Sequence, residues 1–452
     1  MNQNRDMFTS RIGFLLASVG AAAGLGNIWK FPYMAGQYGG AAFLLVYLIS
    51  VVVLGIPLLL AEISLGKETR TNIIGAYEAF TSKKCWKYVG YLGVFTSVVV
   101  LGFYSMVGGW SIYYMFASMK GDFTGLTPDQ FGQYFGSFIS QPFQPIFFQI
   151  LFLLLTLLIT VKGVEKGIEK ANKIMMPLLT VFVVILIIRS LTLPGASKGL
   201  EFLFHFDFSK ITPLVILAAL GQAFFSLSLG MGGMLTYGSY LPKEMPIKKT
   251  VVQIALYDTV FSFFISLVIF PAIFSFHFEP TAGPSLVFIT LPAIFTKIPF
   301  GSFFALIFFA LVTVAALTSA INILEIALAA IIDRQGYSRI KAVVILSVLI
   351  LLFGIPSSLS FGVLSNVKLF GLSLFELMDF FASNISLPLG GILLALYVGF
   401  VWGIKKAMVS VGFTPQDRIA KAWAISIQYV APIIVFAVFL QVTGIFKVLG
   451  IF

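Results

Sequence analysis

Long apolar stretches recur along the whole chain, separated by short clusters of glycine, proline and charged residues. Each stretch has about 20 residues, the length that a helix needs to cross the hydrocarbon core of a bilayer. The pattern predicts about eleven spans, at residues 10–37, 42–63, 88–118, 145–162, 171–192, 212–240, 247–277, 300–333, 338–355, 373–402 and 417–447. We therefore expect an all-α polytopic membrane protein in which residues 1–452 form a single transmembrane domain.

The composition excludes several other classes of protein. Only 10% of the 452 residues are charged and 59% are hydrophobic, whereas a soluble domain has about 25% charged residues, so a soluble enzyme is excluded. The single cysteine, Cys85, cannot form a disulfide within the chain. The two histidines, His205 and His277, lie in predicted loops far apart, which leaves little material for a zinc or haem site. The basic residues are scattered between apolar segments, so the net charge of +11 does not indicate nucleic-acid binding.

The positions of the basic residues predict the orientation in the membrane. With the N-terminus in the cytoplasm, most of the 29 lysines and arginines fall on the cytoplasmic side. Those at or near the outer side are Lys30, Lys120, Arg189, Lys198, Lys210, Lys297, Lys368 and Lys447. An odd number of spans then places the C-terminus outside. A cleaved signal peptide also fits Arg5, Arg11 and the alanines at 21–23, but the chain continues directly into a second apolar half.

Three segments between spans are predicted to lie outside. Residues 119–144 and 193–211 are rich in Gly, Pro, Ser and Asp and are expected to be external loops. The stretch 278–299 is apolar but is interrupted by several prolines, so it is too broken to span. It is interpreted as a short helical external lid, and an ordinary folded loop is equally compatible with it.

Two spans contain glycine clusters that would interrupt a helix. The first span has Gly20, Gly24, Gly26 and Asn27, and the sixth has the run Ser226-Leu-Ser-Leu-Gly-Met-Gly-Gly233. Their separation by five spans predicts two inverted repeats, 10–192 and 212–402, each with its first helix unwound at the midplane, and an extra span at 417–447. The alternative is close packing through small residues, but matched clusters at corresponding positions favour the repeats.

An unwound helix pair has a specific chemistry. The free carbonyl groups attract Na⁺ and an ammonium group, and the free N–H groups attract a carboxylate. Two such helices therefore suit a zwitterion together with a cation.

Several carboxylates lie in or at the ends of predicted spans, where an uncompensated charge costs about 3 kcal/mol on insertion scales. They are Glu62, Asp258, Glu325, Asp333 and Asp379. Asp258 has no basic residue nearby in sequence, which favours a cation as its counter-charge. Thr318 and Ser319, with Ala315 one turn earlier, offer oxygen atoms that suit a hard cation, although such hydroxyls also bond to helix carbonyls.

At this point the sequence resembles a known family. The run Gly24-Leu-Gly-Asn-Ile-Trp-Lys-Phe-Pro32 is similar to the first-span signature of the neurotransmitter:sodium symporters, whose bacterial model is the leucine transporter. The match covers spans 1 to 10 in order and continues through Gly39-Gly40, Ala41 to Phe43, Gly55-Ile-Pro-Leu58, Glu62, Gly163 to Lys170, Lys173, Pro177, Phe224 to Gly230, Thr236-Tyr237, Ser239-Tyr240, Leu317-Thr-Ser319 and Met378-Asp-Phe380.

The resemblance implies two sodium sites and two gates. The first sodium site would use the carbonyl of Ala22, the side chains of Asn27, Ser226 and Asp258, and the substrate carboxylate. The second would use the carbonyls of Gly20, Ala23 and Ala315 with the hydroxyls of Thr318 and Ser319. The outer gate would be the pair Lys30 and Asp379. The inner gate would be Arg5 and Asp333, with Tyr240 nearby.

The resemblance also implies a substrate pocket. Tyr104 would bond to the substrate carboxylate, Phe225 would form an aromatic lid, and Ala22, Gly24, Gly26 and Ser226 would lie at the amino-acid end. The side-chain end would be lined by Val100, Tyr104, Phe225, Ser228, Met231, Ser319, Asn322 and Ile323. These walls are mostly apolar, so a hydrophobic or aromatic L-amino acid is expected, and the unbranched Met231 suits several sizes. Asn322 would meet a phenol or indole, or cap a backbone group.

Three departures from the family pattern change the expectation. Asp258 stands where many relatives have asparagine, and its fixed charge predicts chloride independence, although Tyr47, Gln222, Ser226 and Ser262 resemble the chloride-binding set. Asp258 is also expected to bind a proton once sodium leaves, which predicts proton counter-transport. Lys30 replaces the usual arginine and lacks its bidentate fork. Eleven spans rather than twelve are typical of the shorter bacterial branch, and so predict a bacterial inner membrane.

The function expected from these features is sodium-coupled symport by alternating access, with membrane lipid and a small-molecule substrate as partners. Two alternatives use the same spans. An ion-conducting channel also contains broken helices, and an amino-acid sensor would bind without transport. A membrane enzyme is disfavoured because the sequence offers no nucleophile beside a base.

Overall fold

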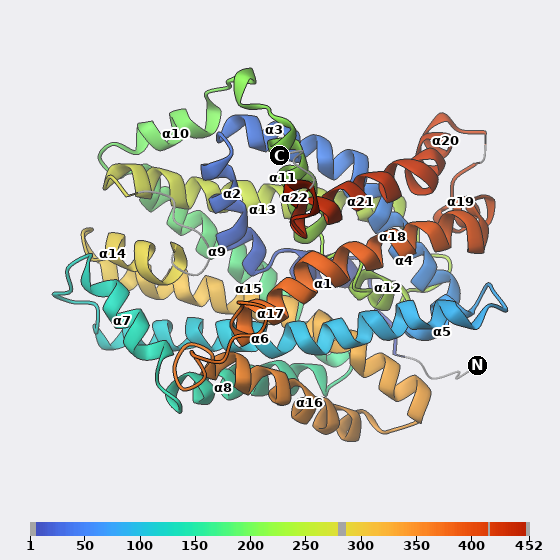
Figure 1. Cartoon of the computed structure of the whole chain (residues 1–452), viewed down its shortest axis with the longest axis horizontal. Coiled ribbons are helices and arrows are strands. Elements are labelled where there is room, and N and C mark those ends of the chain that lie inside the picture. Colours follow the sequence, from blue (N-terminus) through green and yellow to red (C-terminus); the bar gives the residue numbers. More distant parts are fainter. Residues whose placement is uncertain (1–5, 279–285, 415, 449–452) are drawn as a thin grey trace.

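The computed structural model describes residues 6–278, 286–414 and 416–448, and this part of the chain is built of helices joined by short connections (Figure 1). In these described residues, β-type pairing is limited to an isolated bridge between Leu369 and Leu372. Most of the long helices run along one direction, the horizontal axis of Figure 1. The all-α class predicted from the apolar pattern is confirmed.

The first five predicted spans correspond to helices in the predicted order. They are α1 (Arg11–Ala22), η1 (Gly26–Lys30) and α2 (Phe31–Gln37); α3 (Ala41–Ser50), η2 (Val51–Gly55) and α4 (Ile56–Thr69); η3 (Lys84–Trp86) and α6 (Lys87–Lys120); α8 (Gln144–Thr160); and η4 (Val164–Glu169) and α9 (Lys170–Leu191). The helix of span 2 ends at Thr69 rather than at the predicted residue 63, because its last turns are polar and so lie beyond the apolar stretch.

The remaining spans also follow the predicted order. They are α11 (Pro213–Ser226) and α12 (Gly233–Gly238); α13 (Lys248–Ser275); α15 (Gly301–Gln335); α16 (Arg339–Leu359); α17 (Leu374–Asp379), η7 (Phe380–Ser386), α18 (Leu387–Leu396), η8 (Tyr397–Gly403) and α19 (Ile404–Val411); and α20 (Arg418–Ile425), η9 (Ser426–Val430) and α21 (Ala431–Val442). A short helix, α22 (Ile445–Val448), follows.

The number of spans agrees with the apolar pattern. Within the described residues, eight helices are long and apolar enough to cross a membrane, and two bent helix pairs raise this number to ten. The sixth predicted span is not among these ten. Its halves α11 and α12 have 14 and 6 residues, and neither half is long enough to be counted as a membrane-spanning helix. The protein is therefore a multi-pass membrane protein.

The segments predicted as external loops contain helices of their own. They include α7 (Gln130–Ile139), α10 (Ala196–Phe204), η5 (Phe208–Lys210), and the pair η6 (Leu286–Thr290) and α14 (Leu291–Phe295). The lid predicted at 278–299 is thus helical from Leu286, while Glu279, Pro280 and Pro284 lie outside the described residues. Aromatic packing holds these helices in place: Phe135 of α7 stacks on Phe288 of η6, with ring centroids 5.5 Å apart. Trp110 of α6 meets both rings edge-on.

Local sequence signals explain where several helices begin. Thr212 caps α11 by accepting a hydrogen bond from Val215 N, and Pro213 occupies the first helical position, where a missing N–H has no cost. Ser373 and Glu376 form a reciprocal capping box at the start of α17. These caps lie at the ends of spans, where the helix termini meet polar surroundings.

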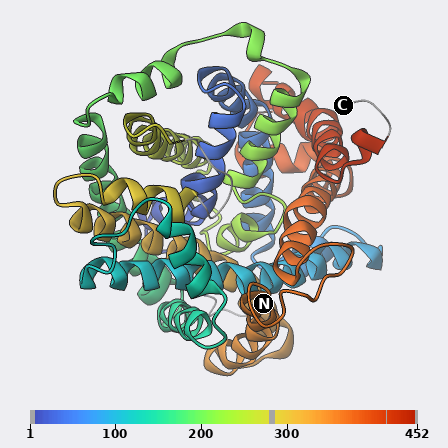
Figure 2. The same ribbon diagram turned by 60° about the vertical axis from the view of Figure 1, so that its left-hand side comes forward.

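The two broken spans lie at the centre of the bundle. The longest helices, α6 and α15, pack extensively against each other, and α1 packs against α9, α13 and α15. The inner half-helix α12 packs against α4 and α15. Figure 2 shows the first span, in dark blue, enclosed by the other helices. Interrupted backbone is thus placed inside protein, where its polar groups find partners other than lipid.

Candidate sodium and substrate site

Span 1 is broken between Ala22 and Gly26. The helix ends as Ala23 N–H bonds to Val19 O at 2.7 Å, and the chain resumes as a helix after a bend of 54°. The carbonyls of the last turn of α1 are then free of helical partners. The hydroxyl of Ser319 donates to two of them, Gly20 O and Ala21 O, each at 3.2 Å. The unwinding predicted for this span is confirmed.

Span 6 is broken between Ser226 and Gly233, also as predicted. Gly230 and Gly232 adopt φ of 88° and 89°, in the left-handed region that favours glycine. Ser228 has φ 52° there without being glycine, which costs roughly 1–3 kcal/mol and is typical of functional sites. Its hydroxyl donates to Ala21 O at 3.3 Å, so the two breaks contact each other.

Glu62 of α4 stabilises the break in span 6. Its carboxylate accepts a 2.9 Å hydrogen bond from Gly230 N–H, just before the inner half-helix α12 begins. A negative charge is favourable there because unpaired N–H groups give a helix N-terminus positive potential. Glu62 is buried, and this contact provides a structural role for one of the intramembrane carboxylates.

A buried polar cluster connects spans 1, 2, 6 and 7. The amide nitrogen of Asn27 lies within hydrogen-bond distance of Asp258 Oδ1 at 2.7 Å, Ser262 Oγ at 2.8 Å and Ser226 Oγ at 3.0 Å, and its two hydrogens are shared among these acceptors. Ser226 and Tyr47 donate to Asp258 Oδ2 at 2.7 and 3.1 Å. These partners are neutral, and in the described part of the chain no lysine or arginine pairs with Asp258, which is 0% exposed. The cluster therefore carries an uncompensated negative charge that a cation would balance.

The residues expected at the second sodium site also converge. Thr318 donates to Ala315 O at 2.9 Å within α15, and the hydroxyl of the next residue, Ser319, contacts Gly20 O. Gly20 and Thr318 face each other so closely that a Cβ at position 20 would lie 3.0 Å from Thr318 Cβ. Ala23 is buried at the adjacent end of α1. Carbonyl and hydroxyl oxygens from two helices are thus available to a hard cation.

The unwound part of span 1 contacts span 3 through Tyr104. Leu25 N–H points to the Tyr104 hydroxyl at 3.4 Å. A Cβ at Gly24 would lie 2.5 Å from Ser319 Oγ and 3.1 Å from the Tyr104 hydroxyl, so a side chain there would collide with both. The Leu25 N–H and the Tyr104 hydroxyl thus lie together at the break, and donors of this kind suit a carboxylate.

Phe225 lies between the unwound backbone and the expected outer gate. Its ring lies against Gly26, where a Cβ would come within 2.6 Å, and Lys30 Nζ lies 3.9 Å from the ring centroid. No ion pair within 4.0 Å joins Lys30 to Asp379, and the Asp379 carboxylate accepts from Ser383 at 2.8 Å. In this conformation the lysine is a cation–π partner of the lid, and the outer gate pair stays a prediction.

The remaining residues expected to line the substrate pocket are buried. Val100 lies one turn before Tyr104 on α6, and Ile323 lies one turn after Ser319 on α15. Met231 lies within the break of span 6. Asn322 donates to Gly233 O at 3.3 Å, which places its amide on the backbone of α12. Of the two roles considered for Asn322, capping of a backbone group is the one that the structure displays.

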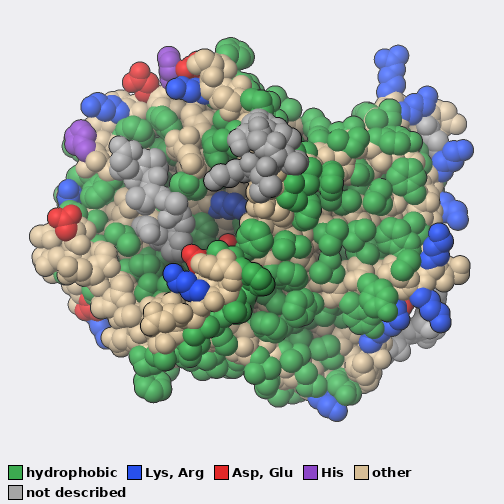
Figure 3. Space-filling view, viewed as in Figure 1, with side chains coloured by type: hydrophobic (Ala, Val, Ile, Leu, Met, Phe, Trp, Pro, Cys, Tyr) green, Lys and Arg blue, Asp and Glu red, His purple; other side chains and the backbone are tan. Residues whose placement is uncertain are grey.

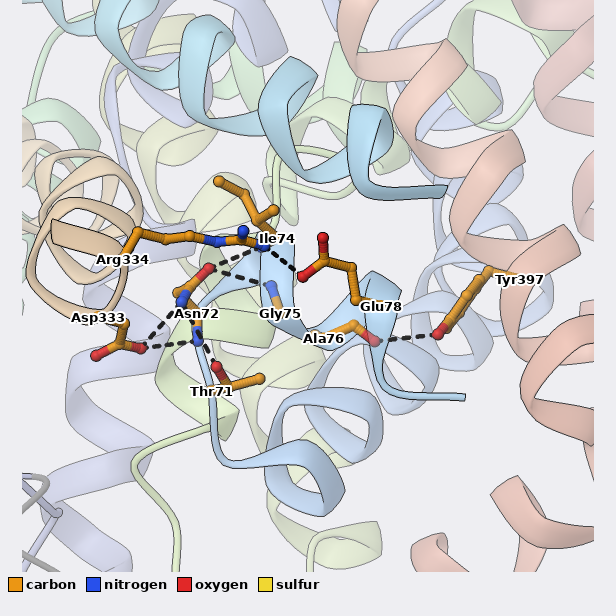
Figure 4. Close-up of polar contacts among 9 residues, drawn as sticks. All are labelled: Thr71, Asn72, Ile74, Gly75, Ala76, Glu78, Asp333, Arg334 and Tyr397. Atoms are coloured by element: carbon orange, nitrogen blue, oxygen red, sulfur yellow. Dashed lines mark hydrogen bonds and ion pairs between the residues drawn. The ribbon is translucent and has the colours of Figure 1, made fainter. Parts of the chain in front are cut away.

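The inner end is held by polar contacts around α5 (Ile73–Glu78). Asn72 caps α5, and its own N–H and amide donate to Asp333 of α15 at 3.0 and 3.1 Å (Figure 4). Arg334, the next residue, pairs with Glu78 at the other end of α5. Arg5, the expected partner of Asp333, lies outside the described residues. Asp333 therefore binds α5 to α15 in addition to any role in the gate.

Another inner contact satisfies a buried carboxylate. Glu325 accepts from Tyr240 at 2.7 Å and forms an ion pair with Arg339 of α16. Glu325 is fully buried and the arginine is largely buried. Arg339 was absent from the sequence-based set, because its proximity depends on the turn between α15 and α16. Tyr240 lies at the inner end of span 6, as the resemblance implies.

Sequence reasoning missed a polar residue beside the second sodium set. Asn172 of α9 is buried, and its Oδ1 lies 2.5 Å from where a Cβ of Gly20 would be. Within the described residues this oxygen has no hydrogen-bond partner. The one sequence signal was an asparagine near the start of an apolar span.

Gln222, one turn before Ser226, is buried, and neither its amide oxygen nor its amide nitrogen has a hydrogen-bond partner in the described part of the chain.

These features define a class of protein: a helical membrane transporter of the leucine-transporter fold, with two broken helices meeting at a buried polar centre. The chain belongs to the sodium:neurotransmitter symporter family, whose model matches residues 5–127 and 139–450. It is 41% identical over 447 residues to the sodium-dependent transporter YhdH of Bacillus subtilis, covering 98% of this chain and 99% of that protein. A sodium-dependent transporter of Haemophilus influenzae is 37% identical, with 97% and 98% coverage.

A solved structure has the same fold. The crystal structure of MhsT in complex with L-phenylalanine superposes with a TM-score of 0.89 at 44% sequence identity, covering 97% of this chain and 100% of that one. The family and the fold both identify the chain as a transporter rather than an enzyme. Use of Na⁺ follows from membership in a sodium-dependent family.

Proposed function

We propose that this protein takes up hydrophobic or aromatic L-amino acids by sodium-coupled symport with alternating access. The observation that carries the proposal is the Asp258 carboxylate, buried between the two broken spans among the neutral donors Asn27, Ser226 and Tyr47. A buried carboxylate without a basic partner is costly in a membrane, so a bound cation stabilises it. The sodium-dependent relatives support Na⁺ as that cation.

The substrate carboxylate would bind between the N–H groups of the unwound span 1 and the Tyr104 hydroxyl. The approach of Leu25 N–H to the Tyr104 hydroxyl, at 3.4 Å, supports this placement. The side-chain end of the site would be formed by Val100, Met231 and Ile323, which offer apolar surface and no charge to balance a charged substrate. That the related MhsT was solved with L-phenylalanine agrees with an aromatic substrate.

Two sodium ions per cycle are proposed. The first would bind at Ala22 O, Asn27, Ser226 and Asp258, and the second between α1 and α15. Moving two positive charges inward with a zwitterion gains about 4.6 kcal/mol per 100 mV of membrane potential. Because about 1.4 kcal/mol corresponds to a factor of ten, this gain supports roughly thousandfold accumulation.

Chloride independence is proposed because Asp258 supplies a fixed negative charge beside the first sodium site. The same carboxylate is proposed to bind a proton after sodium leaves, so that protons would be carried outward during the return step. Uptake into liposomes would then depend on internal pH. Transport that collapses when gluconate replaces chloride would contradict the chloride proposal.

The proposed location is the inner membrane of a bacterium, with the N-terminus in the cytoplasm and the C-terminus outside. Lysine and arginine side chains crowd the end of the molecule that carries α19 and α20, and a broad apolar surface lies beside it (Figure 3). The positive-inside rule supports placing this end in the cytoplasm. Residues 10–192 and 212–402 are proposed as the inverted repeats, with 417–447 as the additional span.

The experiment that tests the proposal is uptake of a labelled amino-acid panel by purified protein in liposomes, with and without an inward Na⁺ gradient. Saturable, Na⁺-dependent uptake of aromatic or aliphatic amino acids with counterflow is expected. Flux without saturation would indicate a channel, and Na⁺-dependent binding without flux would indicate a sensor. A preference for glycine, proline or a γ-amino acid would contradict the proposed substrate class.

A further inference from the structure

A cavity lies at the lysine-rich end of the molecule, apart from the two helix breaks. It has a volume of about 830 Å³ and lies among the end of α4, the segment between α12 and α13, and α19. Five lysines line it: Lys67, Lys243, Lys248, Lys405 and Lys406. Two glutamates, Glu68 and Glu244, are the acidic residues in its walls. Five positive against two negative charges leave the cavity at +3.

The acidic residues do not neutralise the lysines of α19. Glu68 is engaged by Lys243 at 3.8 Å and by the hydroxyl of Ser410 at 2.9 Å. Lys405 and Lys406 are exposed, and in the described part of the chain neither has an acidic partner within 4.0 Å. Adjacent lysines without counter-charges repel each other, so an anion bound between them is stabilised.

Lys248 is already oriented toward the same region. Its ammonium group donates to Gly412 O at 2.7 Å, at the end of α19, and lies 5.1 Å from the ring centroid of Phe413. An ammonium group has three donors, so donors remain for a further acceptor. Three lysines from two different spans are thus directed toward one cavity.

The walls of the cavity combine this charge with apolar surface. Trp402 stacks on Phe80 with centroids 5.2 Å apart, and both line the cavity. On α13, Lys248, Val252 and Leu256 occupy positions i, i+4 and i+8 and so share one helix face. Val252 and Leu256 are 48% and 59% exposed. An exposed apolar stripe thus runs from Lys248 at the start of α13 toward the middle of this helix.

We propose that this cavity binds an anionic phospholipid of the cytoplasmic leaflet. Lys248, Lys405 and Lys406 would contact the phosphate, and an acyl chain would lie along Val252 and Leu256. Basic pockets between membrane helices on this side suit such headgroups. A soluble anion would use the lysines but not the apolar stripe, so the combination selects a lipid. The site lies apart from the transport centre and does not depend on the proposed substrate.

Binding of short-chain lipids to the purified full-length protein tests the site. Dioctanoyl-phosphatidylglycerol is titrated and bound lipid is counted by native mass spectrometry, with dioctanoyl-phosphatidylcholine and glycerol 3-phosphate as the neutral and soluble probes. The variant is Lys405→Gln/Lys406→Gln. The matched control is Lys83→Gln/Lys84→Gln, which removes the same charge from exposed positions that do not line the cavity.

The expected result is that phosphatidylglycerol binds the Lys405→Gln/Lys406→Gln variant about tenfold or more weakly than wild type, because each lysine near an anionic headgroup contributes. The control variant should retain wild-type binding. Equal loss in both double variants would show a general charge effect and overturn the proposal. Equal binding of phosphatidylcholine, or competition by glycerol 3-phosphate at similar concentration, would overturn the choice of an anionic lipid.

Discussion

The amide of Asn27, in η1 just after the break of span 1, donates a 2.7 Å hydrogen bond to the carboxylate of Asp258 on α13, 231 positions later in the chain. This contact joins the first span of one proposed repeat to the second span of the other. Each side chain is buried, and Asp258 has no basic partner in the described part of the chain. A carboxylate held by neutral donors at a helix break can respond to the arrival and departure of a cation.

Replacing Asp258 with asparagine tests the role of this charge. Asp258→Asn removes the negative charge and keeps the size of the side chain, so Na⁺ affinity in chloride-free buffer should fall about tenfold or more. Chloride should partly restore it, because Tyr47, Ser226 and Ser262 remain as donors. The measurement is Na⁺-dependent substrate binding in gluconate and in chloride. Unchanged affinity in gluconate would exclude Asp258 as a sodium ligand.

Replacing Ser319 with alanine tests the second sodium site. Ser319→Ala removes the hydroxyl that bonds to Gly20 O and Ala21 O, so the Na⁺ concentration for half-maximal uptake should rise about tenfold. Thr313→Ala is the control on the same helix, because the Thr313 hydroxyl bonds to Phe309 O and Ser111 instead. Equal effects of the two substitutions would indicate a general packing defect.

Gly26→Ala tests whether Phe225 must approach the unwound backbone. The added methyl group would lie 2.6 Å from the ring, and overpacking of this kind costs about 1–3 kcal/mol. The maximal uptake rate should fall about tenfold, and Phe225→Leu in the same chain should partly restore it. Gly132→Ala is the control, because a Cβ there meets nothing within 4 Å. Normal uptake by Gly26→Ala would show that Phe225 need not approach closely.

Removing one partner of the buried pair Glu325–Arg339 tests its effect on stability. Arg339→Met leaves a buried carboxylate without its counter-charge and should destabilise the protein by about 3 kcal/mol or more. The double variant Glu325→Gln/Arg339→Met should recover most of this loss. The exposed pair Arg334–Glu78 is the control, because Arg334→Met should cost less than about 1 kcal/mol. The measurement is the midpoint of thermal unfolding of each variant in detergent. Similar midpoints for Arg339→Met and Arg334→Met would contradict a stabilising role for the buried pair.

The sequence alone was enough to predict the helical class, the order of the spans and the two breaks. Membrane insertion imposes a fixed length on apolar segments, and an interrupted helix in lipid is tolerated in few settings. The glycine clusters around Gly24 and Gly230 could therefore be interpreted without any contact information. The run from Gly24 to Pro32 carried the family resemblance, whereas Asp258 was a departure from the family pattern, and the structure brings Asn27 of that run into contact with Asp258.

The tertiary structure decided which side chains satisfy the buried charges. Glu325 and Arg339 were both visible in the sequence, but their pairing depends on the turn between α15 and α16, and Glu62 reaches Gly230 from another span. The helices α7 and α10 were also missed, because their stability comes from packing against neighbours rather than from an apolar run. Apolar length is a local property of the chain, whereas partners for buried polar groups come from segments that only folding brings together.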